Sequence, residues 1–277
     1  MPLARTADLV AAAHRTGAGV MAFNVITLEH AEAIVTGAER AESPVILQIS
    51  ENAVKFHHGR LWPIAAATAA VAAHAKIAAS VHLDHVEDLE LLHSISETGA
   101  SSAMFDASKL SYADNVAATK AAADWAHERD LFMEAELGEV GGKDGAHAPG
   151  VRTDPAEAAA FVAATGVDAL AVAVGSSHAM SDRTATLDFE LIARLRAGVS
   201  VPLVLHGSSG VADADLRKAV AAGITKINVG TLLNMRFTGA VRSHLASDDS
   251  VSDPRRYLAP ARDAVADAVA TMIAAVN

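Results

Sequence analysis

Three histidines occupy corresponding places at the ends of short apolar runs. His85 ends VHLDH, His178 ends ALAVAVGSSH and His206 ends VPLVLH. If these runs are parallel strands of an α/β barrel, their carboxyl ends converge on one face, so residues far apart in sequence can meet around one ion. Three imidazoles with an open fourth position are typical of a catalytic zinc ion rather than a closed structural one. We therefore expect these histidines to bind Zn²⁺.

Acidic residues accompany the histidines. Asp84 directly precedes His85, and this adjacency makes it awkward for both to bind one ion, so we expect a free carboxylate that acts as general acid or base. Asp106 and Glu136 also end apolar runs, and each either belongs to the same site or forms a salt bridge or a helix-capping contact. His82 shares a strand face with Asp84 and is expected inside the barrel, as packing or as support for a ligand.

Two turns of small residues indicate a phosphate site. HGSSG (206–210) and NVGT (228–231) end the seventh and eighth predicted strands. In barrels such turns lead into a helix N-terminus, where small residues let backbone N–H groups approach a phosphate. Lys226 offers a rival chemistry, because lysines at strand ends can form Schiff bases with carbonyl substrates. A solvated or salt-bridged lysine is the alternative.

The elements that must position these residues alternate along the chain. The eight strand candidates are Val20–Asn24, Val45–Ile49, Ala79–Asp84, Ser102–Asp106, Leu131–Glu136, Ala169–Val174, Val201–Leu205 and Ile224–Val229. Helical patterns lie between them and hairpin signals are absent, so we expect a parallel sheet. Eight strand–helix units predict a closed TIM (β/α)8 barrel, and a doubly wound open sheet is the alternative.

Local signals place several other elements. Ser111 with Asp114, and Asp154-Pro155 with Glu157, are helix-start patterns. The glycine-rich segment Gly138–Arg152 is expected to be a lid over the strand ends, with an ordinary surface loop as the alternative. A further amphipathic helix is expected after Asp253, outside the ring of helices.

Length and composition narrow the class of protein. A chain of 277 residues with 51% apolar residues suits one barrel domain, residues 1–277. The net charge of −11 argues against a nucleic-acid partner and leaves a small phosphorylated ligand compatible. The absence of cysteine excludes disulfides and thiolate chemistry. The N-terminal region lacks the apolar core of a signal peptide, and no apolar run reaches the length of a membrane span, so we expect a cytoplasmic protein without a membrane partner.

Motifs spread over nearly the whole chain carry a family resemblance. They are AFNVITLEH, VILQIS, VHLDHVEDLELL, SAMFDAS, EAELGEVGG, TDPAEAAAFVAATGVDALAVAVGSSH, LHGSSGV, KINVGT and DPRRYLAPARDAV. HLDH followed by ELGxxGG is highly specific. The sequence resembles the class II, metal-dependent ketose-bisphosphate aldolases, especially the fructose- and tagatose-bisphosphate branch.

The resemblance implies a role for each candidate residue. The implied zinc ligands are His85, His178 and His206, with Asp106 and Glu136 around an alternative metal position. Asp84 is the implied acid or base at the carbon–carbon bond, and a monovalent cation, Na⁺ or K⁺, is implied near the phosphate. The implied substrate-binding residues are Asn24, Ser50, Gly175, Ala179, Gly207, Ser208, Ser209, Asn228, Gly230, Thr231 and Arg255.

This chain departs from the family pattern at the phosphate loops and at the lid. Ala179 replaces a glycine and is expected to weaken a phosphate contact, and Gly230 stands where an acidic residue is common. The lid usually reads GGxED, whereas residues 141–145 are GGKDG. The glutamate that exchanges the enediolate proton is therefore missing, and we expect Asp144 to serve as the catalytic residue in its place.

These features predict a lyase of carbohydrate metabolism that catalyses a reversible aldol cleavage. The expected substrate is fructose or tagatose 1,6-bisphosphate, and the products are dihydroxyacetone phosphate and glyceraldehyde 3-phosphate. Arg255 or Arg256 is expected to bind the distal phosphate across a subunit boundary, since the resemblance implies a homodimer or a homotetramer. The alternatives are an aldolase for another phosphorylated ketose, a zinc hydrolase on the same barrel, and a sugar-phosphate-binding protein that has lost catalysis.

Overall fold

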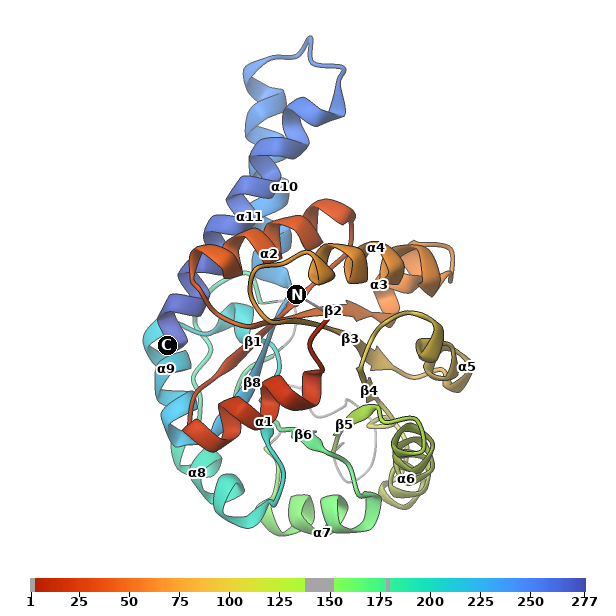
Figure 1. Ribbon diagram of the computed structural model, residues 1–277. Helices are drawn as coiled ribbons and strands as arrows, with labels where there is room; N and C mark the ends of the chain where they lie inside the picture. Colours follow the sequence, from red (N-terminus) through yellow and green to blue (C-terminus); the bar gives the residue numbers. More distant parts are fainter. Residues whose placement is uncertain (1–2, 138–151, 178–179) are drawn as a thin grey trace.

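The chain forms a closed barrel of eight parallel strands in chain order in the computed structural model (Figure 1). The structure describes residues 3–137, 152–177 and 180–277. The first strand pairs with both the second and the eighth, so the barrel is confirmed and the open-sheet alternative is wrong. The strands are β1 (Val20–Asn24), β2 (Val45–Ser50), β3 (Ala79–Val86), β4 (Ser102–Phe105), β5 (Phe132–Glu136), β6 (Ala169–Ala171), β7 (Leu203–Leu205) and β8 (Ile224–Val229).

Two strands, β6 and β7, are shorter than the sequence predicts by two or more residues. The expected sixth strand extends to Val174, but β6 ends at Ala171, because the Ala173 N–H donates to the Thr153 hydroxyl instead of to a neighbouring strand. β7 begins two residues later than expected, since Pro202 has no N–H to offer to the sheet. Sequence patterns do not register such local competition for hydrogen bonds.

Helices separate the strands and surround the barrel (Figure 1). They are α1 (Thr6–Thr16), α2 (Leu28–Arg40), α3 (Glu51–Phe56), α4 (Leu61–Ala73), α5 (Leu89–His93), α6 (Tyr112–His127), α7 (Pro155–Thr165), α8 (Phe189–Gly198), α9 (Asp213–Ala222), α10 (Thr231–Ser247) and α11 (Pro254–Val276), with 3₁₀ turns η1 (Ser94–Glu97) and η2 (Ser208–Gly210). Both predicted helix starts are confirmed, because the side chains of Ser111 and Asp154 accept hydrogen bonds from first-turn N–H groups. Within the described ranges, no helix combines the length and apolar character that a bilayer span requires.

Buried side chains form two hydrophobic layers. The larger layer lies between the outer face of the barrel and the surrounding helices. The smaller one fills the amino-terminal end of the barrel lumen, where Ala22, Ile46 and Val204 of the strands meet Leu9 and Val10 of α1. Because α1 closes this end, the opposite end, at the carboxyl termini of the strands, is left for a ligand.

The two C-terminal helices extend away from the barrel side by side (Figure 1). α11 also packs along α2, where Gly37 permits a close crossing: a Cβ at Gly37 would lie 2.5 Å from the Ala266 carbonyl oxygen. The predicted helix after Asp253 is confirmed, and the Asp253 side chain caps it by accepting from the Arg255 N–H. The segment that joins α10 to α11 lies at the end remote from the barrel (Figure 1).

His30 joins α2 to this helical pair. Its ring stacks on Phe237 of α10, with ring centroids 4.7 Å apart and an interplanar angle of 16°. Burial lowers the pKa of His30 to about 4, and the charge of Glu29 only partly opposes this effect. The folded protein therefore favours neutral His30.

We expect His30 to make the fold sensitive to acid. Neutral His30 contributes stability that is present above its ordinary pKa of 6.5 and is lost as the pH falls towards about 4. Between about pH 7 and about pH 4.5, the wild type should lose about 2–3 kcal/mol more unfolding free energy than a His30→Phe variant, which keeps the stacked ring. Urea denaturation at the two pH values measures both losses. Equal losses would contradict the prediction.

Candidate active site at the carboxyl ends of the strands

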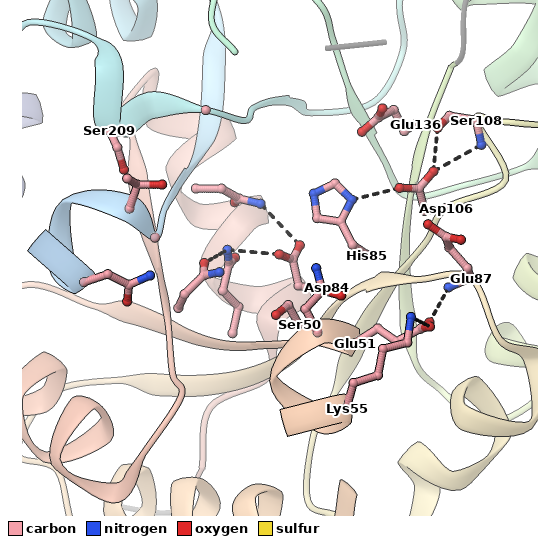
Figure 2. A pocket seen from close by; sticks show the side chains of 18 of the residues that line it. Ser50, Glu51, Lys55, Asp84, His85, Glu87, Asp106, Ser108, Glu136 and Ser209 are labelled. Atoms are coloured by element: carbon pink, nitrogen blue, oxygen red, sulfur yellow. Dashed lines mark hydrogen bonds and ion pairs between the residues drawn. The ribbon is translucent and has the colours of Figure 1, made fainter. Parts of the chain in front are cut away.

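A cavity of about 420 Å³ opens at the carboxyl ends of the strands (Figure 2). It contains most of the described residues that the sequence singles out, from strands at both ends of the chain. The predicted residues that line it are Asn24, Ser50, Asp84, His85, Asp106, Glu136, Gly207, Ser209, Asn228, Gly230 and Thr231. The barrel topology thus brings together side chains that are up to about two hundred residues apart in sequence.

An irregularity in β3 gives two neighbouring residues access to this cavity. The pairing of β3 with β4 shifts between Leu83 and Val86, and His85 has a φ of 50°, in the left-handed region. Neighbours on a regular strand point to opposite faces. Here, Asp84 and His85 both line the cavity. A left-handed histidine is uncommon and costs on the order of 1–3 kcal/mol, so the surrounding structure must hold it in place.

The two described histidines of the predicted triad face each other. His206 Nδ1 lies 3.0 Å from His85 Nε2. The other ring nitrogen of His85, Nδ1, lies 2.9 Å from Asp106 Oδ2, and His206 Nε2 lies 3.0 Å from Glu134 Oε1. Each carboxylate accepts from the ring nitrogen next to it, so the two facing nitrogens direct their lone pairs at a shared point. Two lone pairs at 3.0 Å need a cation between them, and a divalent metal fits this donor set.

The negative charges around His85 also favour a cation at this site. Burial opposes a charge on His85, but the negative charge of Asp84 and the hydrogen bond to Asp106 outweigh it and raise the pKa of His85 to about 10. Asp106 is the partner of this pair, and its pKa is lowered by the hydrogen bond and charge of His85 although burial opposes the shift. Without a metal, a proton on His85 therefore supplies the positive charge that the carboxylates require.

Asp84 lies at the junction of the lumen and the cavity. Burial raises its pKa, and the positive charges of His85 and Lys226 oppose this shift. Its two oxygens lie 3.3 Å from Gln48 Nε2 and 3.4 Å from Asn228 Nδ2. A carboxylate with a raised pKa, held by two amides beside the two facing histidine nitrogens, is suited to proton transfer.

Carboxylate oxygens are close enough to the histidines to take part in binding an ion. Donor atoms of Asp84, His85 and His206 lie within 4.8 Å of one another, and so do those of His85, Asp106 and Glu136. The β3 irregularity turns Asp84 and His85 to the same side, so their adjacency in sequence does not keep Asp84 from an ion that His85 could bind. The role of Asp84 in proton transfer stays a prediction.

Other predicted residues lie elsewhere. Ser208 is buried in η2, where its hydroxyl donates to the Leu205 carbonyl, and it does not line the cavity. Gly175, with a φ of 123°, allows the backbone to pass the Thr186 carbonyl, which would lie 2.1 Å from an added Cβ. Arg255 is exposed at the start of α11 and pairs with Asp253, 2.7 Å away. His178, Ala179 and Asp144, with almost all of the expected lid, lie outside the described residues.

Lys226 does not reach the cavity in the way that the Schiff-base hypothesis needs. Its side chain is fully buried in the lumen, and Nζ lies 2.7 Å from Glu134 Oε2 and 3.2 Å from His82 Nε2. The alternative reading of a salt-bridged lysine is confirmed. His82 lies inside the barrel as expected, and burial together with the charge of Lys226 lowers its pKa well below the ordinary value.

Several residues of the site escape the sequence analysis. Gln48 and Glu134 carry polar side chains into the lumen, and the exposed side chains of Lys55 and Lys109 line the cavity. Strand parity could have found the first two, since Gln48 is two residues before Ser50 and Glu134 two before Glu136. No comparable signal marks the lysines, because exposed lysines at loop and helix positions are common.

Comparison with known proteins agrees with this architecture. A family model described as fructose-bisphosphate aldolase class-II matches residues 4–277. The YdjI aldolase of Escherichia coli K12 is 32% identical, with a TM-score of 0.82 over 99% of this chain and 97% of that chain. A fructose-bisphosphate aldolase of Campylobacter jejuni is 21% identical, with a TM-score of 0.82 over 100% and 96% of the two chains, and this likeness shows the fold alone. The match over almost the whole chain shows that this protein belongs to the class-II fructose-bisphosphate aldolase family.

Proposed function

We propose that this chain is a zinc-dependent aldolase that reversibly cleaves a ketose 1,6-bisphosphate, either fructose or tagatose, to dihydroxyacetone phosphate and glyceraldehyde 3-phosphate. The observation that carries the proposal is the pair of facing nitrogens on His85 and His206 beside the buried carboxylate of Asp84. The family to which the chain belongs supports the reaction class.

The metal site of this proposal consists of His85 and His206 with His178 as the third ligand. The first two meet the expected chemistry because each is backed by a carboxylate that orients the ring. A zinc ion held there would supply a Lewis acid for the ketone oxygen of the substrate. Asp106 and Glu136 are close enough for an alternative metal position, and a Na⁺ or K⁺ ion near the phosphate belongs to the same proposal.

Asp84 moves the proton in this scheme. In the cleavage direction its carboxylate removes the hydrogen from the hydroxyl on the carbon that is cleaved, and in condensation it returns it. Gln48 and Asn228 hold the carboxylate from both sides. The amide oxygens Gln48 Oε1 and Asn228 Oδ1 are buried and have no protein partner among the described residues. Substrate hydroxyl groups are suitable donors for them.

The phosphate of dihydroxyacetone phosphate is assigned to the turns after β7 and β8. Gly230 and Thr231 line the cavity where α10 begins, and the N-cap residue, Gly230, has no side chain that could occupy the first N–H groups. Its first N–H groups and its dipole favour an anion. Gly207 has a φ of 65°, and an added Cβ would lie 2.5 Å from the Ser177 carbonyl oxygen, so glycine is required for this turn. Ser209 accepts from the Leu232 N–H and keeps its own O–H for a ligand.

The distal phosphate needs a cation from another side of the cavity. Arg255 lies near the remote end of the α10–α11 pair (Figure 1). We therefore propose that it reaches a cavity only across a subunit boundary, in a homodimer or a homotetramer. Within the described part of the chain, Lys55 and Lys109 are the lysine and arginine residues that line the cavity, each paired with a glutamate.

We expect Asp84→Ala to keep its zinc and lose its turnover, because the carboxylate transfers a proton rather than holding the metal. After chelation, zinc should restore cleavage of fructose or tagatose 1,6-bisphosphate by the wild type. The variant should bind stoichiometric zinc but stay slower by about two to four orders of magnitude. Metal analysis and initial rates measure the two effects. Loss of zinc from the variant would instead make Asp84 a ligand.

We expect the enzyme to prefer a phosphorylated aldehyde in condensation with dihydroxyacetone phosphate. The kcat/KM for glyceraldehyde 3-phosphate should exceed that for glyceraldehyde by about 10- to 100-fold, since a hydrogen bond to a charged group contributes roughly 1.5–3 kcal/mol. Glyceraldehyde is the matched control because it lacks only the phosphate. Equal values would exclude the bisphosphate substrate and leave the aldolase assignment intact, whereas no condensation with any aldehyde would contradict the aldolase assignment.

We expect activity to return when Asp84→Ala and Arg255→Ala chains are combined in one oligomer. If Arg255 acts across the boundary, a mixed dimer contains one site with both residues intact and should recover about half of the wild-type activity. If it acts within its own chain, both sites stay defective. Co-expression with two affinity tags isolates the hybrid. A hybrid no more active than the better parent, or a fully active monomer in light scattering, would exclude this role.

A further inference from the structure

Beneath the candidate site, the barrel lumen holds a charged pair that the proposed chemistry does not use. Lys226 Nζ lies 2.7 Å from Glu134 Oε2, and both side chains are fully buried. The second oxygen of the same carboxylate, Oε1, lies 3.0 Å from His206 Nε2. We propose that Glu134, held in place by Lys226, is the positioning residue that fixes His206 with Nδ1 as its metal-binding atom.

The hydrogen-bond inventory of the three groups determines the tautomer. An ionised carboxylate can only accept, so the hydrogen of a neutral His206 must lie on Nε2, next to Glu134. The lone pair then lies on Nδ1, the atom that faces His85 Nε2 at 3.0 Å. Asn228 Nδ2 also lies 3.0 Å from His206 Nε2, but its hydrogens have another acceptor in Asp84 Oδ1, 3.4 Å away. The ionised Glu134 has no hydrogen to donate, so it determines that His206 Nε2 carries one.

A chain of hydrogen bonds on the other side fixes Lys226. Its ammonium group can only donate, and His82 Nε2 accepts from it at 3.2 Å. His82 Nδ1 therefore carries the hydrogen and donates to the Ser102 hydroxyl at 2.8 Å. Ser102 in turn donates to the Thr6 hydroxyl of α1 at 2.7 Å. The hydrogen bonds run in one consistent direction from Lys226 to Thr6, so the network ties the site to the helix that closes the far end of the barrel.

Glu134 orients His206 as Asp106 orients His85, but different groups hold the two carboxylates in place. Asp106 orients His85 and itself accepts from the Ser108 hydroxyl and N–H at the cavity wall. Glu134 has no access to the cavity, and a buried carboxylate needs a compensating charge. Lys226 supplies that charge. The need for this charge explains why Lys226 is fully buried although the proposed mechanism gives it no catalytic role.

The inference depends on the proposed function only in that a metal binds His206. Its most direct test is the protonation pattern of His206 in the wild type. Long-range proton–nitrogen NMR spectra of histidine-labelled protein, assigned with a His206→Gln variant, distinguish the two ring nitrogens. We expect hydrogen on Nε2 with and without Zn²⁺, and zinc on Nδ1. Hydrogen on Nδ1 in the metal-free protein, or zinc on Nε2, would overturn the proposal without any variant of the pair.

Two double variants separate positioning from stability. Glu134→Leu with Lys226→Met removes the acceptor, and Glu134→Gln with Lys226→Met keeps an amide oxygen for His206 in the same background. Both remove the two charges together, which avoids leaving one buried charge alone. We expect the zinc dissociation constant to rise about 10- to 100-fold with leucine, with mixed tautomers of His206, and to stay within about threefold of the wild type with glutamine.

The competing outcomes are distinct. The inference would be overturned if the leucine double variant kept the hydrogen on His206 Nε2 and the zinc affinity of the wild type. It would also be overturned if the glutamine double variant bound zinc as weakly as the leucine double variant. Circular dichroism and thermal unfolding check that both are folded. If both fail to fold, the wild-type spectra alone decide. Zinc bound as expected without cleavage of any ketose bisphosphate would contradict the proposed function and leave the inference standing.

Discussion

Polar groups inside the barrel must find partners there, because burial removes them from water and an unpaired polar group is costly. The lumen meets this constraint in layers. α1 and apolar side chains of the strands fill the amino-terminal end, and the Lys226–Glu134 pair with His82 occupies the middle. Removing one partner of such a pair typically costs about 3–5 kcal/mol, so each layer depends on the one beneath it. The unpaired acceptors of Gln48 and Asn228 occur where the lumen meets the cavity, which is where a ligand arrives.

The same constraint explains the electrostatics of the site. Carboxylates back both described histidines, and Asp84 adds a further negative charge next to them. Such a cluster is stable only with a cation at its centre, which is a proton on His85 in the metal-free protein and, in the function that we propose, a divalent metal. The proposed metal binding is therefore linked to proton release at this site.

The end of the cavity that we propose for the phosphate depends on a different part of the structure. α10 begins at the cavity and continues into the helical pair that leaves the barrel (Figure 1). Its packing on α11, and the contact of Phe237 with His30 on α2, hold the helix whose N-terminus is assigned to the phosphate. The other end of the pair carries Arg255 outward, so one structural unit connects the near phosphate of one site with the proposed distal phosphate of another.

The sequence by itself determined the barrel and the convergence of its strand ends. Periodic apolar runs specify eight parallel strands, and parity places Asp84, Glu136 and Asn228 inward, because side chains alternate along a strand. Strand parity also places Gln48 and Glu134 inward. Their hydrogen-bond partners lie on other strands, so the local sequence does not identify them. Only the tertiary structure decided that the β3 irregularity turns His85 to the same side as Asp84, and that Lys226 is neutralised in the lumen rather than available as a nucleophile. The reason is physical: backbone irregularities and buried ion pairs depend on which strands become neighbours, and that is settled only when the barrel closes.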